Sequence, residues 1–214
     1  MHRWWARERG RGLSPIGLGM ALFGVALVAR VTYAEELRYG FLVWNLFLAW
    51  LPWLLSAFAE RAAARRRDLL LLVIGVGWLL LLPNAPYVVT DLMHLRRHPP
   101  TPLWYDAILL GTAATTGLFA GAFALRRMQD AVTTRCGARA GWALVALALP
   151  ASGLGIYLGR FERLNSWDAI LHPLAVARSV LASLGPRAFV VSAAMAGLFA
   201  MTYLALGRPR LDTE

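Results

Sequence analysis

The chain has 214 residues, of which 58% are hydrophobic and only 16% are charged, and its mean hydropathy is +0.53. Soluble domains carry about 25% charged residues, so these values exclude a soluble globular domain, a disordered chain and a coiled coil. The net charge is +10 and every basic residue other than histidine is an arginine. Because these arginines lie between long apolar runs, we expect a membrane protein with no nucleic-acid partner.

Six apolar runs are each near the roughly 20 residues that a helix needs to cross a bilayer. They lie at residues 16–31, 41–59, 69–89, 107–125, 142–159 and 188–206. We therefore predict an all-α integral membrane helical bundle that forms a single domain over residues 1–214. The first run has an alternative interpretation as a cleaved signal peptide, because arginines precede it and the sequence TYA at residues 32–34 resembles a cleavage site.

The distribution of arginines predicts the orientation of the bundle. With the N-terminus inside, 14 arginines lie in inner segments and 8 lie in outer segments. The inner segments are 1–15, 60–68, 126–140 and 207–214, and the outer segments are 30–40, 90–106 and 160–187. Since arginine is enriched in cytoplasmic loops, both termini are predicted in the cytoplasm, with the protein in the cytoplasmic (inner) membrane.

Small residues at four-residue spacing predict close packing between helices. Ala113, Gly117 and Gly121 have this spacing in the fourth run, and Gly155 and Gly159 have it in the fifth. Such faces can pack within the chain or against a second copy, so an oligomer is left open.

The third run is interrupted by the sequence LPNAPY at residues 82–87. Its two prolines remove two backbone donors and favour non-helical dihedral angles at the preceding residues, Leu82 and Ala85. Such a break is tolerated in a membrane only where it faces protein or a wet cavity. The sequence therefore predicts a buried or water-lined break near the outer end of this run.

A new helix that starts at Pro86 would place Tyr87, Asp91 and His94 on one face. The alternative is that the helix simply ends at the membrane interface, with Tyr87 as an aromatic anchor.

Residues 166–184 predict an amphipathic helix on the outer surface. Asp168 lies in its first turn, and the pair His172-Pro173 predicts a distortion in its second. The apolar residues at helical spacing are Trp167, Ile170, Leu171, Leu174 and Leu181.

Two acid–histidine pairs are thus predicted on one membrane side, Asp91 with His94 and Asp168 with His172. With Asp106 or Glu162 added, they make an oxygen and nitrogen donor set that suits a divalent metal. Either pair can also provide a carboxylate-oriented histidine as a general base. The alternative for each pair is an ordinary solvated helix face.

Other polar residues at the same end suggest binding of an anion. Arg160 and Arg163 follow the fifth run, and arginine favours bidentate contact with phosphate, so an anionic lipid headgroup or a polyprenyl phosphate is a candidate ligand. Internal ion pairs are the alternative. Asn45 lies inside a span, where an amide needs a partner, and we expect that partner on a neighbouring helix or at the broken backbone near Asn84.

The candidate residues fall into two groups. The candidate catalytic and metal-binding residues are Asp91, His94, Asp168 and His172. The candidate substrate-binding residues are Asn45, Asn84, Tyr87, Asp106, Arg160, Arg163, Asn165 and Trp167. The sequence contains no Walker loop, no Gly-x-Ser-x-Gly and no His-Glu-x-x-His motif.

Three sequence runs resemble signatures of a bacterial membrane family known as domain of unknown function 1361. They are LPNAPYVVTDLMHL at residues 82–95, GIYLGR with NSWD within residues 155–168, and NLFLAWLP at residues 45–52. The resemblance covers about residues 41–175. It implies a small polytopic inner-membrane protein and brings no activity, cofactor or catalytic residue with it.

These patterns leave two hypotheses for the function. The first is an enzyme that acts on a lipid or lipid-linked substrate at an outward-facing polar pocket, with a divalent metal as an optional cofactor. The second is a non-enzymatic subunit or transporter-like protein that binds lipid or a partner. Transporters place polar groups near the bilayer midplane, and the apolar middles of these spans disfavour a transport pathway.

Overall fold

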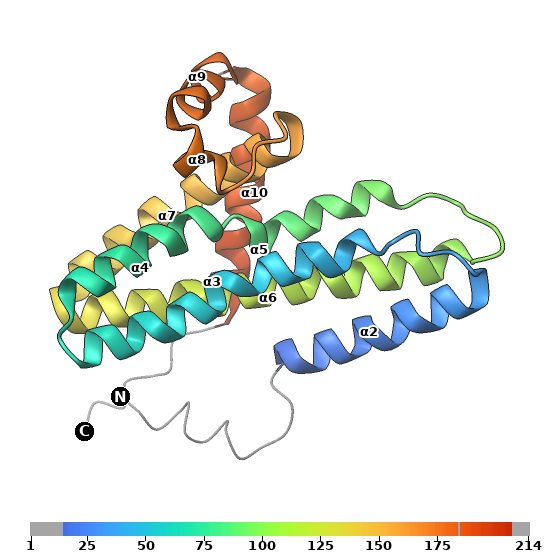
Figure 1. Cartoon of the computed structure of the whole chain (residues 1–214), viewed down its shortest axis with the longest axis horizontal. Helices are drawn as coiled ribbons and strands as arrows, with labels where there is room; N and C mark the ends of the chain where they lie inside the picture. The colour runs from blue at the N-terminus through green and yellow to red at the C-terminus, as the bar shows by residue number, and fades with distance from the viewer. Residues whose placement is uncertain (1–14, 184, 207–214) are drawn as a thin grey trace.

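The computed structural model describes residues 15–183 and 185–206, and this part of the chain contains helices and no β-strand (Figure 1). In chain order the helices are α2 Pro15–Ala34, α3 Phe41–Ala64, α4 Asp68–Leu81, α5 Asn84–Tyr87, the 3₁₀ helix η1 Val88–His94, α6 Leu103–Cys136, α7 Ala138–Phe161, α8 Asp168–Leu171, α9 Pro173–Ser183 and α10 Pro186–Ala205. Six segments in this part are long and apolar enough to cross a membrane, and one of them combines α4, α5 and η1. The predicted all-α membrane bundle is confirmed.

Helix α6 is the centre of the bundle, because it contacts α2, α3, α5, η1, α7 and α10. It has 34 residues and extends well beyond the predicted span of residues 107–125. Ion pairs support the extension, since Arg127 pairs with Glu60 of α3 at 2.6 Å and Arg135 pairs with Asp68 of α4 at 2.7 Å. The helix ends at Gly137, whose φ of 87° lies in the region that glycine adopts without strain.

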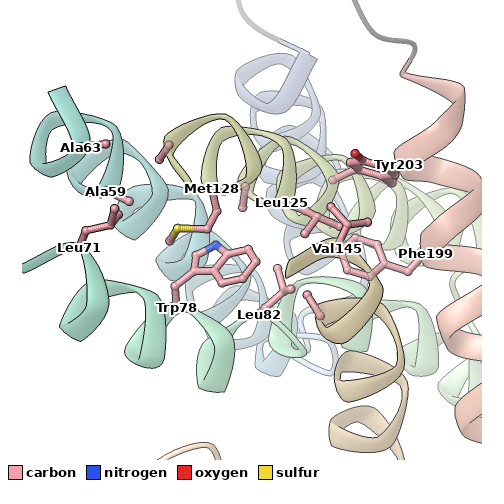
Figure 2. Close-up of a cluster of buried hydrophobic side chains, with 14 of the residues drawn as sticks. Ala59, Ala63, Leu71, Trp78, Leu82, Leu125, Met128, Val145, Phe199 and Tyr203 are labelled. Carbon is pink, nitrogen blue, oxygen red and sulfur yellow. The ribbon is translucent and has the colours of Figure 1, made fainter. Parts of the chain in front are cut away.

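The largest buried cluster joins α3, α4, α6, α7 and α10. Figure 2 shows Trp78 of α4 beside Met128 of α6, with Val145 and Phe199 farther along the cluster. In Figure 1, α10 crosses α6 steeply instead of lying alongside it. A second cluster lies around Phe23, Tyr39, Leu42, Leu46 and Leu109, near the end of the bundle that carries residues 35–40 and 95–102. This end is called the Asp91 end below.

The break in the third span lies against the small residues of α6 and α7. A Cβ atom added to Gly117 would lie 2.5 Å from the carbonyl oxygen of Ala85, and one added to Gly155 would lie 2.6 Å from Cγ of Pro83. The predicted close packing at these glycines is therefore confirmed within the chain. It brings the interrupted backbone against protein, as a break inside a membrane requires.

Two details of the predicted break are wrong. Leu82 precedes a proline but keeps helical dihedral angles, φ −54° and ψ −39°, so the chain loses hydrogen bonds without leaving the helical region. The next helix begins at Asn84, not at Pro86, and continues as a 3₁₀ helix from Val88. Two carbonyls at the break have donors, because Leu82 accepts from the backbone N–H of Ala85 at 3.1 Å and Leu81 accepts from Nδ2 of Asn84 at 3.0 Å.

The predicted amphipathic helix at residues 166–184 is two helices, α8 and α9. His172 separates them with φ −135° and ψ 54°, because a residue before proline disfavours the helical region. The predicted apolar face is present and points away from the chain, since Ile170, Leu171, Leu174 and Leu181 are all exposed. Val180 instead packs toward α7 and α10, in a small cluster around Tyr157 and Ala188.

Candidate functional site

Asp91 is the centre of a polar cluster at the Asp91 end. Its side chain is only 2% exposed, although carboxylates are rarely buried without a partner. Nδ2 of Asn45, from α3, donates to Oδ2 of Asp91 at 2.7 Å, and Nη1 of Arg160, from the end of α7, lies 3.4 Å from Oδ1. Both carboxylate oxygens therefore have a donor. The expected partner of Asn45 on a neighbouring segment is thus Asp91.

Arg160 connects the three residues that the sequence placed on one helical face. Its guanidinium lies 3.5 Å from the hydroxyl of Tyr87, 3.4 Å from Asp91 and 3.1 Å from Nε2 of His94. The 3₁₀ geometry of η1 explains why Asp91 and His94 lie together, because side chains at positions i and i+3 eclipse one another in such a helix. Of the two predicted arginines, Arg160 therefore joins the cluster.

The contact between Arg160 and His94 involves Nε2 of the imidazole. An arginine guanidinium can only donate hydrogen bonds, so a hydrogen bond here uses the lone pair of Nε2. The ring of His94 also meets the ring of Phe41 edge-on, with centroids 5.1 Å apart. In this arrangement Nε2 of His94 is engaged by Arg160.

A second buried set lies beside the first and joins α2 to α6. Nε of Arg30 pairs with Oδ1 of Asp106 at 2.7 Å, and these side chains are 1% and 0% exposed. The hydroxyl of Tyr39 donates to Oδ2 of Asp106 at 3.2 Å and lies 3.5 Å from the backbone oxygen of His94. Asp106, predicted to bind substrate, is therefore enclosed by protein groups.

Sequence analysis did not select Arg30 or Tyr39 as site residues. A signal for Arg30 was present, because an arginine in an apolar helix is costly unless it is paired and is a functional candidate by default. Tyr39 lies in the connection between α2 and α3, and nothing local in the sequence marks it.

An open pocket of about 310 Å³ lies between these two sets. The six residues that line it are Arg38, Tyr39, Phe41, His94, Arg96 and His98. Four of them have basic side chains and none has a carboxylate. Outside the lining, exposed Glu36 pairs with Arg38 at 2.9 Å. The pocket is thus suited by charge to an anion.

The hydroxyl of Tyr39 stays protonated beside this pocket. Removal from solvent raises the pKa of the Tyr39 phenol, and the neighbouring Asp106 carboxylate raises it further. The protonated hydroxyl donates a hydrogen bond to the Asp106 carboxylate.

The remaining candidate residues lie in the connection that follows α7. Asn84 reaches this connection through a 3.0 Å hydrogen bond from Nδ2 to Oγ of Ser166. Oδ2 of Asp168 accepts from the backbone N–H of Asn165 at 2.7 Å, which closes the turn before α8. Arg163 and Trp167 are exposed.

The two predicted acid–histidine pairs do not join into one group. Within residues 15–183 and 185–206, no three or more His, Cys, Asp or Glu side chains are placed to hold a metal ion together. Asp91 uses its oxygens for Asn45 and Arg160, and Arg160 also occupies Nε2 of His94. His172 is exposed at the junction of α8 and α9.

Removing the hydrogen bond from Asn45 should show how much this donor to the buried Asp91 carboxylate stabilises the protein. An Asn45→Ala variant is expected to lose about 1–2 kcal/mol of unfolding free energy, because it leaves one oxygen of a buried carboxylate without a donor. Reversible unfolding in detergent measures the loss. A double-mutant cycle with Asp91→Ala isolates the pair, and additive effects of the two substitutions would show that the bond contributes nothing.

The fold and composition together define a class, since a chain with several long apolar helices around a small polar end is a multi-pass membrane protein. The family model described as Protein of unknown function (DUF1361) matches residues 44–202. The chain belongs to this family, as the three sequence runs suggested. Among curated proteins and among solved structures, no significant match is found.

Proposed function

We propose that this membrane protein binds the anionic headgroup of a lipid or lipid-linked molecule in the pocket at the Asp91 end. The observation that carries the proposal is the lining of that pocket, in which two arginines and two histidines meet without a carboxylate. Arginine binds phosphate and carboxylate oxygens through paired N–H donors. His94 and His98 add two imidazoles to the lining.

A lipid is favoured over a soluble anion by the surface next to the pocket. Phe41 lines the pocket and begins α3, and the following turns of α3 expose Trp44 and Phe47, which are 55% and 50% accessible. A headgroup in the pocket would thus have an apolar helix surface beside it for an acyl or prenyl chain. The arginine distribution supports placing this end at the outer leaflet of the cytoplasmic membrane, with both termini inside.

A more specific form of the proposal is an enzyme that acts on the bound lipid. This form requires His94 to act as a general base. With Nε2 of His94 in contact with Arg160, proton abstraction by this nitrogen would require Arg160 to move away. The binding function is therefore proposed first. A binding subunit without a reaction of its own is compatible with the same pocket.

The proposal is tested by lipid binding to the purified full-length protein in detergent, measured by native mass spectrometry. Phosphatidylglycerol is expected to bind more tightly than phosphatidylcholine, and Arg96→Gln should weaken its binding about tenfold, because one charge-assisted contact is lost. Arg97→Gln is the matched control, since Arg97 is the exposed neighbour of Arg96 and does not line the pocket; it should change binding less than about twofold.

Equal weakening by Arg96→Gln and Arg97→Gln would contradict the proposal, because it would indicate general attraction to negative charge. Equal affinity for the two lipids in the wild type would also contradict it. Competition by glycerol phosphate distinguishes a lipid headgroup from a soluble anion as the ligand. A lipid site requires the intact lipid to bind more tightly than this soluble headgroup.

A further inference from the structure

Half of the pocket lining comes from one short segment of the chain. Arg38 and Tyr39 lie in the connection between α2 and α3, and Phe41 is the first residue of α3. All three precede residues 44–202, the part that matches the family. The side chains that hold this segment in place therefore influence which ligand the pocket accepts.

One buried side chain of α2 contacts this segment at two points. Besides its 2.7 Å ion pair with Asp106, Arg30 donates from Nη1 to the backbone oxygen of Glu36 at 3.4 Å. Its guanidinium also stacks on the ring of Tyr39, with Cζ 4.7 Å from the ring centroid. Arg30 thus contacts the connection at two points on either side of Arg38.

Asp106 holds the same segment from α6. One of its carboxylate oxygens pairs with Arg30 and the other accepts from the hydroxyl of Tyr39. The Tyr39 hydroxyl is also 3.5 Å from the backbone oxygen of His94, another lining residue. Tyr39 therefore links the α2–α3 connection to η1 as well as to Asp106 of α6.

We infer that Arg30 and Asp106 are positioning residues for the anionic-headgroup pocket, and that α2 is thereby part of the binding site. The inference rests on the proposed function. Neither residue lines the pocket. Each acts through Tyr39 and the backbone of residues 36–39, which set the position of the Arg38 guanidinium and the Phe41 ring.

The test compares lipid affinity with thermal stability in the full chain. The double substitution Arg30→Met with Asp106→Leu removes the pair without leaving a buried charge, and such replacements often preserve folding. Its phosphatidylglycerol affinity is expected to fall about tenfold, as after loss of one charge-assisted contact, while its unfolding temperature stays near the wild-type value. Arg30→Lys provides the test if the double variant does not fold. It keeps the charge but not the planar stacking group, and it should weaken binding several-fold.

The outcomes separate this inference from the proposed function. If Arg96→Gln weakens binding while the double variant and Arg30→Lys bind as tightly as wild type, the positioning role is overturned and the pocket stands. If wild-type protein does not prefer phosphatidylglycerol, the proposed function fails and the inference fails with it. A double variant that loses affinity only in proportion to its stability would also overturn the positioning role.

Discussion

An Arg30→Met variant is expected to lose about 3–5 kcal/mol of unfolding free energy, because it leaves the Asp106 carboxylate buried without its cation. Tyr39 can still donate to that carboxylate, but a phenol does not neutralise it. Equilibrium unfolding in detergent, monitored by circular dichroism, measures the loss. It is the largest effect of a single substitution that we expect in this chain.

Two comparisons control this prediction. Arg38→Met breaks the exposed pair with Glu36, in which the side chains are 39% and 49% accessible, and should cost less than about 1 kcal/mol. Adding Asp106→Leu to Arg30→Met should restore most of the lost stability. A loss below about 1 kcal/mol for Arg30→Met alone would show that the buried pair does not hold α2 to α6.

The same pair bears on the first span. Cleavage after Ala34, the alternative that the signal-like features raised, would remove Arg30 and leave Asp106 with Tyr39 alone. A buried carboxylate without its cation is costly.

A Gly117→Ala variant is expected to lose about 2–3 kcal/mol, because its new methyl group would meet a backbone carbonyl that cannot turn aside. The added Cβ atom would lie 2.5 Å from the oxygen of Ala85 and 3.2 Å from Val88. Both neighbours belong to the interrupted third span, so the substitution separates that span from α6. Thermal unfolding in detergent measures the effect.

Gly111→Ala is the matched control in the same helix. A Cβ atom at Gly111 would meet nothing within 4 Å, and alanine favours a helix over glycine by about 0.5–1 kcal/mol. Gly111→Ala should therefore leave the stability unchanged or raise it slightly. Equal effects at the two glycines would mean that the close approach to Ala85 does not stabilise the bundle.

The sequence was sufficient to assign much of the site to one end of the helix bundle. The sequence predicted that Asn45, Tyr87, Asp91, His94 and Arg160 gather at one end, and the structure brings these five together. It predicted an outward-facing polar pocket but not the lining residues Arg38, Arg96 and His98, because these lie in connections with no periodic pattern. The position of a connection depends on the helices that it joins.

The pairing of the charged residues was not predictable for a different reason. Asp106 was expected to face a ligand or a metal ion, but it faces Arg30 of α2. Which face of α6 meets α2 depends on the rotation of both helices, and that rotation follows from packing contacts far along the chain. The close approach of Gly19 in α2 to Thr116 in α6 is one such contact.

The sequence by itself determined that this protein is a bundle of apolar helices with its unusual polar residues at one end. Hydropathy, span length and proline position are properties of consecutive residues, so they can be read without knowing the neighbours. Only the tertiary structure decided that Asp91 meets Asn45 and Arg160, that Asp106 meets Arg30, and that a basic pocket lies between the two sets. Those pairings depend on how closely and at what rotation the helices meet, which is decided by packing across the whole bundle.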